Sequence, residues 1–245
     1  MTPTYYARHG EFTEVNDHGA LFETLPSEVA GLCRVIQGLL IHDHSGLHYY
    51  GDPPESFHRA SRETVPVGRR IAEIVAAHSA PALDPRPPFE RAVGTCRDFA
   101  LMLCAMLRHQ GVSARVRCGF AAYFIPPSYE DHWVCEYWNA HDRRWALADA
   151  QLDDAHKTHL SIDFDTTDIP RDRFLSSRRA WRRCRSNPAD AALFGHGDGT
   201  GEWFVRVNLA RDWLSLGKRE VSPWDTWRDA REQHCQAGVA ARHSD

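Results

Sequence analysis

Two stretches in the first eighty residues carry apolar side chains at the spacing of an amphipathic helix. The first follows Ser27, which is placed to act as the N-cap, and its apolar positions are Val29, Leu32, Cys33, Ile36, Leu39 and Leu40. The second is marked by Val67, Ile71, Ile74, Val75 and His78. The segment 80–89 contains four prolines in ten residues, which predicts a non-helical connector.

The strongest helical pattern covers residues 96–110, where ten of fifteen side chains are apolar and lie on more than one face. Thr95 and Asp98 have the spacing of a capping box, with Asp where Glu or Gln is commoner. Gly111 stands where a helix often ends in a left-handed residue. We therefore expect a central buried helix of about 22 Å.

Strand patterns follow this helix directly. Residues 112–120 alternate between apolar and polar or small side chains, as in a half-buried strand. Residues 132–138 and 145–151 flank a polar turn and predict a hairpin. Further helices are expected at 171–185 and 202–216. This order of elements indicates an α+β protein, with residues 1–245 as a single domain, a core at about 90–152 and a C-terminal helical extension at about 170–230.

Composition narrows the class of protein. The chain has 245 residues, of which 42% are hydrophobic and 25% charged, as in ordinary globular proteins. Its net charge of −4 gives no basic field, so no nucleic-acid partner is expected. The longest apolar run, at 99–107, has nine residues and is too short to cross a bilayer. The first twenty residues lack the apolar stretch of a secretion signal, and we expect a cytoplasmic protein without a membrane partner.

Seven cysteines cannot all pair within one chain, so a disulfide scaffold is not expected. Cys96 stands out because it lies in the first turn of the central helix, where unpaired N–H groups and the helix dipole favour a thiolate. Cys33, Cys104 and Cys118 lie on apolar faces and are expected in the core. No context distinguishes the remaining three, Cys135, Cys184 and Cys235.

His132 and Asp149 lie on the two strands of the predicted hairpin. Their side chains share one face if the two residues pair directly or lie two residues out of register, whereas a slip of one residue separates them. A carboxylate beside an imidazole orients the second ring nitrogen of a general base. Together with Cys96, these residues would form a site for cysteine acyl transfer.

The segments GTCRDFALMLCAMLRHQGVSARVRCGF, DHWVCEYW and RRWALADAQ carry a specific resemblance. In order and spacing they resemble the bacterial transglutaminase-like proteins, a branch of the papain-like cysteine superfamily, over about residues 90–152. The chain departs from the family pattern at three places. Trp133 follows His132 immediately, Ala150 replaces a frequent Pro after Asp149, and Ser113 replaces another Pro.

The resemblance implies a papain-like core in which Cys96 is the nucleophile, His132 the base and Asp149 the orienting carboxylate. A thioester on Cys96 would pass its acyl group to water or to an amine, and both acceptors stay open. The substrate would be a small-molecule, peptide or carrier-bound acyl compound. The backbone N–H of Cys96 and one side chain would bind the oxyanion, and the side-chain candidates are Gln37, His42 and His44.

Two other patterns suggest partners. His42, His44 and His48 have an H-x-H-x₃-H spacing, but a chance cluster is expected among fifteen histidines, and no metal or cofactor is predicted. Residues 171–185 contain seven arginines. The simpler interpretation is a solvated face paired with Asp163, Asp165, Asp168 and Asp172, and the sharper one is a docking site for an acidic partner.

The rival hypothesis to an enzyme is a catalytically silent transglutaminase-like module that binds a peptide or partner protein. The presence of all three triad residue types favours the enzyme. The sequence leaves the substrate and the oligomeric state open.

Overall fold

The computed structural model describes residues 3–44, 46–59, 66–77 and 81–222. By contacts the chain divides into two compact units. The first unit comprises Met1–Arg117 and Trp133–Pro170, and the second comprises Cys118–His132 and Arg171–Asp245. Two neighbouring strands, β3 (Ala114–Ala121) and β4 (Tyr129–Asn139), run through both units. Because neither unit is one continuous segment, the single domain over 1–245 stays a prediction.

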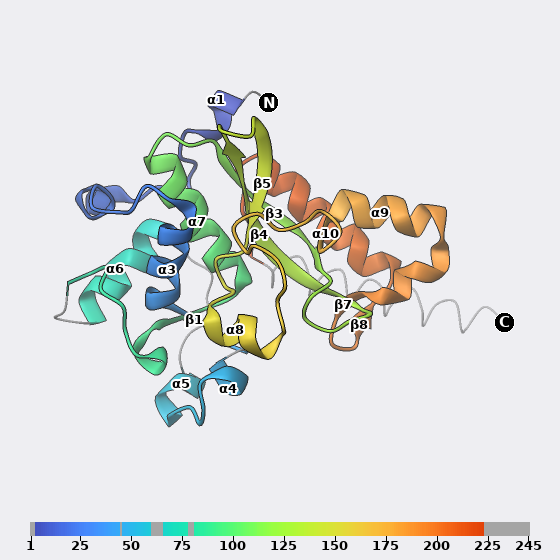
Figure 1. Ribbon diagram of the computed structural model, residues 1–245, viewed down its shortest axis with the longest axis horizontal. Helices are drawn as coiled ribbons and strands as arrows, with labels where there is room; N and C mark the ends of the chain where they lie inside the picture. The colour runs from blue at the N-terminus through green and yellow to red at the C-terminus, as the bar shows by residue number, and fades with distance from the viewer. Residues whose placement is uncertain (1–2, 45, 60–65, 78–80, 223–245) are drawn as a thin grey trace, which may run out of the picture. The chain divides into compact units, whose positions relative to one another are not determined.

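The first unit contains most of the helices. Helix α7 (Cys96–His109) packs against α3 (Val29–Leu39) and α6 (Val67–Ala77), and Figure 1 shows the three together. The shorter elements of this unit are α1 (Pro3–Tyr6), η1 (Asn16–His18), α2 (Gly19–Phe22), α4 (Gly46–Tyr49), α5 (Glu55–Arg59), η2 (Pro88–Glu90) and α8 (Asp154–His159). The connector predicted at 80–89 therefore leads into one 3₁₀ turn, η2. His78, which was assigned to the second helix, lies outside the described residues.

Both ends of α7 confirm the predicted signals. The backbone N–H of Thr95 donates to the carboxylate of Asp98 at 2.7 Å, which completes the capping box. At the other end Gly111 has a φ of +75°, and its N–H donates to the carbonyl of Arg108 at 2.9 Å. The N–H of Val112 donates to the Leu107 carbonyl at 2.9 Å, so the helix ends in a Schellman motif.

The limits of α3 differ from the prediction. The helix begins at Val29 with Glu28, not Ser27, as its N-cap. It ends at Leu39, because Leu40 belongs to strand β1 (Leu40–His42). This strand pairs in parallel with β2 (Ala92–Gly94), so His42 lies opposite Gly94. The helical spacing of Leu40 was therefore misleading, since tertiary pairing decides its conformation.

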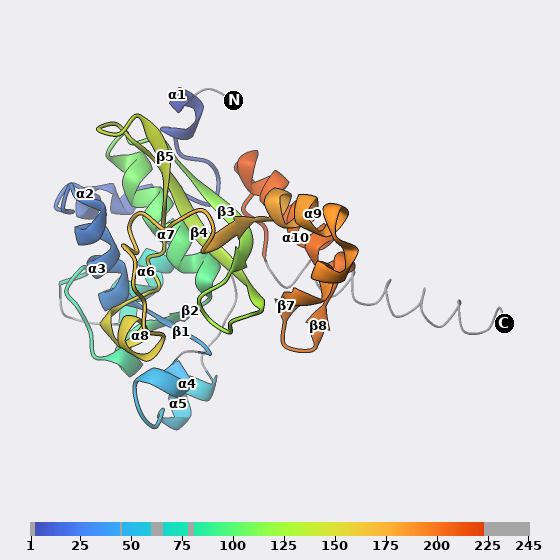
Figure 2. The ribbon, with the colours of Figure 1, turned by 45° about the vertical axis from the view of Figure 1, so that its right-hand side comes forward.

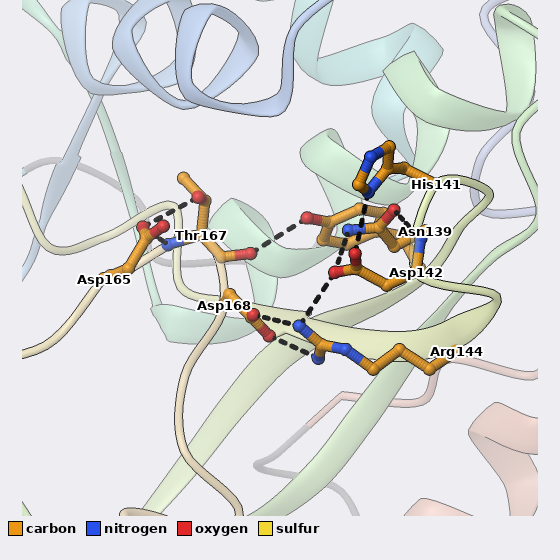
Figure 3. A network of polar contacts seen from close by, with 8 residues as sticks. Asn139, His141, Asp142, Arg144, Asp165, Thr167 and Asp168 are labelled. Carbon is orange, nitrogen blue, oxygen red and sulfur yellow. Dashed lines mark hydrogen bonds and ion pairs between the residues drawn. The ribbon is translucent and has the colours of Figure 1, made fainter.

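The predicted hairpin is confirmed. Strand β5 (Arg144–Ala148) pairs antiparallel with β4, from Cys135 opposite Ala148 to Asn139 opposite Arg144. The segment that follows returns along β5, where the N–H of Ile169 donates to the Leu147 carbonyl at 2.8 Å. Figure 3 shows how this segment meets the turn of the hairpin, with Arg144 between the carboxylates of Asp142 and Asp168.

The second unit packs strands against two helices. Strand β6 (Phe174–Ser176) pairs antiparallel with β3, and β7 (Phe194–His196) pairs in parallel with β4 and antiparallel with β8 (Gly199–Thr200). Helix α9 (Ser177–Ser186) packs against α10 (Glu202–Leu216), and Figure 2 shows the two helices beside each other. Between them in the chain lies η3 (Pro188–Leu193). The apolar core of the unit comprises Phe120, Ala180, Cys184, Ala191, Phe194, Phe204 and Val205.

The helix predicted at 171–185 is partly wrong. It begins at Ser177, and the residues before it form β6. Leu175 pairs with Phe120, and the backbone comes so close at Gly119 that an added Cβ would meet the Leu175 carbonyl oxygen at 2.3 Å. Strand pairing thus overrides the local helical pattern. Phe174 is buried and Trp181 packs against the core, as expected.

Helices and antiparallel strand pairs together make this an α+β protein, as predicted. Over the described part of the chain, no helix has both the length and the apolar character needed to cross a bilayer.

Candidate functional site

Cys96 is the first residue of α7 and follows the N-cap residue Thr95 directly. Among the six cysteines that the structure describes, Cys96 alone is not buried. The first turn of a helix presents unpaired N–H groups and the positive end of the dipole, both of which stabilise an anion. Cys96 therefore combines partial exposure with a location that favours the thiolate.

The charges at the start of α7 are balanced within the first unit. Asp98 is buried and accepts the capping hydrogen bond from Thr95. Two buried guanidiniums lie near its carboxylate, that of Arg97 at 3.6 Å and that of Arg70 at 3.8 Å. Gly94 leaves room for this arrangement, because a Cβ there would meet the Asp98 carboxylate at 3.0 Å. The arginines offset a negative charge that would otherwise oppose a thiolate two residues away in the chain.

The other described cysteines are buried, and their thiols are expected to be less reactive. Burial, together with the nearby Asp149 carboxylate, raises the pKa of the Cys33 thiol to about 12. Burial, together with the adjacent Cys104 thiol, also raises the pKa of Cys135. Cys33, Cys104 and Cys118 are buried, which confirms their predicted place in the core. Cys135 and Cys184 are buried as well, and Cys235 lies outside the described residues.

Asp149 follows β5 immediately and is 1% exposed. Its backbone N–H donates to the carbonyl of Thr166 at 2.9 Å, so the chain has left the ladder with β4 at this residue. Its carboxylate accepts the N–H of Gln151 at 3.0 Å. The tight turn 149–151 therefore holds a buried carboxylate in the first unit.

His132 lies on β4 in the part of the strand that belongs to the second unit, and it is 2% exposed. Its ring packs edge-on against Phe124 with centroids 4.9 Å apart, and Tyr123 lies 6.0 Å away. The pairs between β4 and β5 include neither His132 nor Asp149. Cys96 and Asp149 belong to the first unit and His132 to the second, so their meeting stays a prediction.

The three oxyanion candidates differ in their surroundings. The side-chain amide of Gln37 donates to the carbonyl of Ala150 at 3.2 Å, which ties α3 to the turn after Asp149. His42 lies on β1 opposite Gly94, two residues before Cys96, and its Nδ1 is 3.0 Å from the Asp43 carboxylate. His44 is exposed and its ring contacts that of His48 at 5.0 Å. Of the three, His42 has the backbone position nearest to Cys96 in strand pairing.

A polar cluster beside this region was not predicted. The Asp153 carboxylate accepts hydrogen bonds from the Tyr50 hydroxyl at 2.5 Å and from His156 Nδ1 at 2.7 Å. Arg91 lies 4.0 Å from the same carboxylate and 5.5 Å from the centre of the Tyr50 ring. Burial tends to raise the pKa of Asp153, but the hydrogen bonds from His156 and Tyr50 outweigh it and lower the pKa to about 2.

This cluster joins the strand that leads to Cys96 with the segment that follows Asp149. Asp153 is also the N-cap of α8, where its side chain accepts the His156 N–H at 3.1 Å. The sequence offers one signal for it, the Asp153 to His156 spacing of a cap at a helix start. Among the described residues, no three His, Cys, Asp or Glu side chains are arranged to hold a metal ion.

The expected pairing of the 171–185 arginines is wrong in part. Asp168 binds Arg144 at 2.8 Å, and Asp165 accepts hydrogen bonds from Thr167 (Figure 3). Arg183 pairs with Asp190 at 2.6 Å and donates to the Tyr129 hydroxyl at 2.7 Å. Within the described part of the chain, four exposed arginines of α9 have no carboxylate at ion-pair distance: Arg178, Arg179, Arg182 and Arg185.

Comparison with known proteins finds one family whose model matches part of the chain. Residues 70–150 match the model of the transglutaminase-like superfamily, and this segment contains Cys96, His132 and Asp149. The match confirms the resemblance over these residues. No curated protein matches the chain. Among solved structures, a proposed cysteine protease from Cytophaga hutchinsonii aligns at 17% identity and a TM-score of 0.36, covering 77% of this chain and 48% of that protein. The chain thus spans about half the length of that structure.

Proposed function

We propose that this protein is a cysteine enzyme that transfers acyl groups through Cys96, with His132 as the general base and Asp149 as the carboxylate that orients it. The observation that carries the proposal is the position of Cys96, which begins a capped helix and is not buried. The match of residues 70–150 to the transglutaminase-like superfamily supports the same assignment.

The reaction would begin when the Cys96 thiolate attacks the carbonyl carbon of an amide. A C–S bond forms, the C–N bond breaks, and the protonated His132 gives its proton to the leaving amine. Water or a second amine then attacks the thioester, gives its proton to His132 and releases the thiolate. The first acceptor cleaves the amide bond, whereas the second forms a new one.

The oxyanion of each tetrahedral intermediate needs donors that are already in place. The backbone N–H of Cys96 at the start of α7 is the first donor in this proposal. For the second donor we favour His42, because β1 pairs with the strand that leads into Cys96. Gln37 has a different role in this scheme, since its amide holds the Ala150 carbonyl next to Asp149.

The first experiment is alkylation by iodoacetamide, followed by mass spectrometry of each cysteine. Cys96 should react far faster than the buried Cys33, Cys104, Cys118, Cys135 and Cys184, and the His132→Ala variant should lose this advantage. His156→Ala is the matched control, because it removes another buried histidine that bonds to a carboxylate. Equal, slow labelling of all cysteines would reject the enzyme in favour of a silent binding module.

A second experiment separates the acceptors. Small amides, peptides and carrier-bound acyl compounds are each offered with and without a primary amine. Release of free acid identifies a hydrolase, and formation of a new amide identifies a transferase. Loss of either product in Cys96→Ala confirms that the thiol forms the thioester.

A further inference from the structure

Helix α10 presents a buried polar face to strands β3 and β4 within the second unit. Asn208 and Arg211 are fully buried, and Asp212 is 2% exposed. These three residues lie at i, i+3 and i+4, the spacing that places side chains on one side of a helix. Such a face is costly to bury unless each group has a partner, and here the partners are on the two strands.

Strand β3 provides two of these partners. The backbone N–H of Cys118 donates to the Asp212 carboxylate at 3.1 Å. The Asn208 amide donates to the Gly119 carbonyl at 3.4 Å. On the other side, the Ser177 hydroxyl donates to the Cys118 carbonyl at 2.8 Å. The backbone of β3 is therefore fixed at consecutive residues by α9 and α10.

Strand β4 provides the strongest partner, the Asp131 carboxylate. The Asn208 amide donates to its Oδ1 at 2.7 Å, and the Arg211 guanidinium lies 3.5 Å from its Oδ2. Arg211 also donates to the side-chain oxygen Oδ1 of Asn208 at 2.9 Å, which fixes the amide in the orientation that Asp131 requires. Asp131, Asn208 and Arg211 thus form a closed network.

One peptide bond joins Asp131 to His132, so a displacement of the network moves the backbone that carries the histidine. The ring of His132 contacts two aromatic rings of the same unit, Phe124 and Tyr123, and these contacts restrict the orientation of the imidazole. A catalytic imidazole must be placed within a fraction of an ångström, and a misplacement of 1 Å can cost about a hundredfold in rate. Fixing the adjacent residue from a buried helix meets that requirement.

We propose that Asn208 and Arg211 of α10 are positioning residues, which hold His132 in place by binding the adjacent Asp131. The inference rests on the proposed function, because it assigns a role to the C-terminal helices in the same site. It also explains why α10 retains a buried polar face where apolar residues would pack at lower cost.

The test measures the position of His132 directly, and reactivity separately. Protein with isotope-labelled histidines gives ring signals by NMR, and the signal lost in His132→Ala identifies that residue. In Asn208→Ala and Arg211→Met we expect this signal to shift and its pH titration to change, while the exposed His141 stays unchanged. Alkylation of Cys96 should fall at least about tenfold, measured well below the unfolding temperature of each variant.

Two further variants separate positioning from stability. Ser215→Ala removes a buried hydroxyl from the same helix that has no hydrogen-bond partner among the described residues, and it should leave His132 and Cys96 unchanged. The second is a double variant that combines Asp131→Asn with Asn208→Asp. In it, residue 131 would donate the hydrogen bond and residue 208 would accept it, while the net charge of the pair stays the same. Each single change should reduce the alkylation rate, and the pair should restore most of it.

Two results would overturn the inference. One is an unshifted His132 signal in Asn208→Ala, and the other is a lowered unfolding temperature with Cys96 reactivity intact. Failure of the proposed function looks different, because His132→Ala would then leave the alkylation of Cys96 unchanged. The NMR signal of His132 decides the positioning role in that case as well.

Discussion

Strand β4 carries acidic side chains in both units, and two of them, Glu136 and Asp131, are held in different ways. In the first unit, Glu136 accepts hydrogen bonds from Arg115 at 2.7 Å and from Arg117 at 2.6 Å. In the second unit, Asp131 is bound by Asn208 and Arg211 of α10. Glu136 has partners on the neighbouring strand β3, whereas Asp131 depends on a helix much later in the chain.

The difference shows which partners of buried carboxylates lie within residues 70–150, the segment that matches the family model, and which lie outside it. Arg115, Arg117 and Glu136 all lie within residues 70–150, which match the transglutaminase-like superfamily. Asn208 and Arg211 lie outside that segment. The core therefore compensates its own buried charge, but the end of β4 that carries His132 relies on residues beyond it.

The largest expected effect comes from removing the charge of Glu136. Glu136→Gln leaves two guanidiniums without their carboxylate, and breaking a buried pair in this way costs about 3 kcal/mol of unfolding free energy. Denaturant unfolding measures it. Glu73→Gln, which removes a half-exposed carboxylate 3.4 Å from Arg69, is the control and should cost little. Equal effects in the two variants would contradict a special role for the Glu136 pair.

A methyl group at Gly119 should disturb the other end of β3. Gly119→Ala places a Cβ 2.3 Å from the Leu175 carbonyl oxygen and 2.7 Å from the Phe174 ring, so β6 must move. We expect a loss of about 2 kcal/mol by thermal or denaturant unfolding. Gly199→Ala is the matched variant, because its nearest contact is 3.3 Å. If the two variants lose the same free energy, strand crowding is not the cause.

Asp153→Asn tests a third carboxylate, in the first unit, through its pH dependence. The folded-state pKa of Asp153 is about 2, below its ordinary value of 3.8, so the ionised form stabilises the fold. This stability, about 1–2 kcal/mol, is present above pH 4 and is lost as the pH falls toward 2. The variant should therefore be less stable than the parent at pH 6, and the difference should shrink below pH 4 and disappear below pH 2. A constant difference across this range would contradict the assignment.

The smallest effect on stability is expected from the exposed arginines of α9. Arg178→Ala with Arg182→Ala should change the unfolding free energy by less than about 1 kcal/mol. If this face docks an acidic partner, which is the sharper of the two interpretations of its sequence, the parent should bind poly-glutamate more tightly than the variant. The difference should shrink as salt rises from about 0.05 M to about 0.3 M. If the affinity for poly-glutamate is unchanged both by the salt concentration and by the two substitutions, the docking site is rejected.

Much of the first unit could be predicted from sequence because its signals are local. Thr95, Asp98 and Gly111 act within one turn of the ends of α7, and these limits are confirmed. The hairpin of β4 and β5 is also a local structure, and it was found from its two apolar runs. Cys33 and Cys104 were placed in the core of this unit by the helical spacing of their apolar neighbours.

The second unit was harder because distant residues decide its structure. Phe174–Ser176 forms a strand only through its pairing with β3, and the local sequence favours a helix. The polar residues of α10 interrupt an apolar pattern, and nothing near them in the chain identifies Asp131 as their partner. The triad of Cys96, His132 and Asp149 stays a prediction for a similar reason, since its members belong to both units.

The separation of Asp131 from Asn208 by 77 residues also sets an order in time. The ribosome synthesises the protein from the N-terminus to the C-terminus, so β4 is made well before α10. At roughly 5–20 residues per second, about 4–15 s pass between the synthesis of the two residues. A nascent chain would thus complete α7, which begins at Cys96, before Asn208 and Arg211 can bind Asp131 beside His132. Under the proposed function, activity would therefore arise late in synthesis.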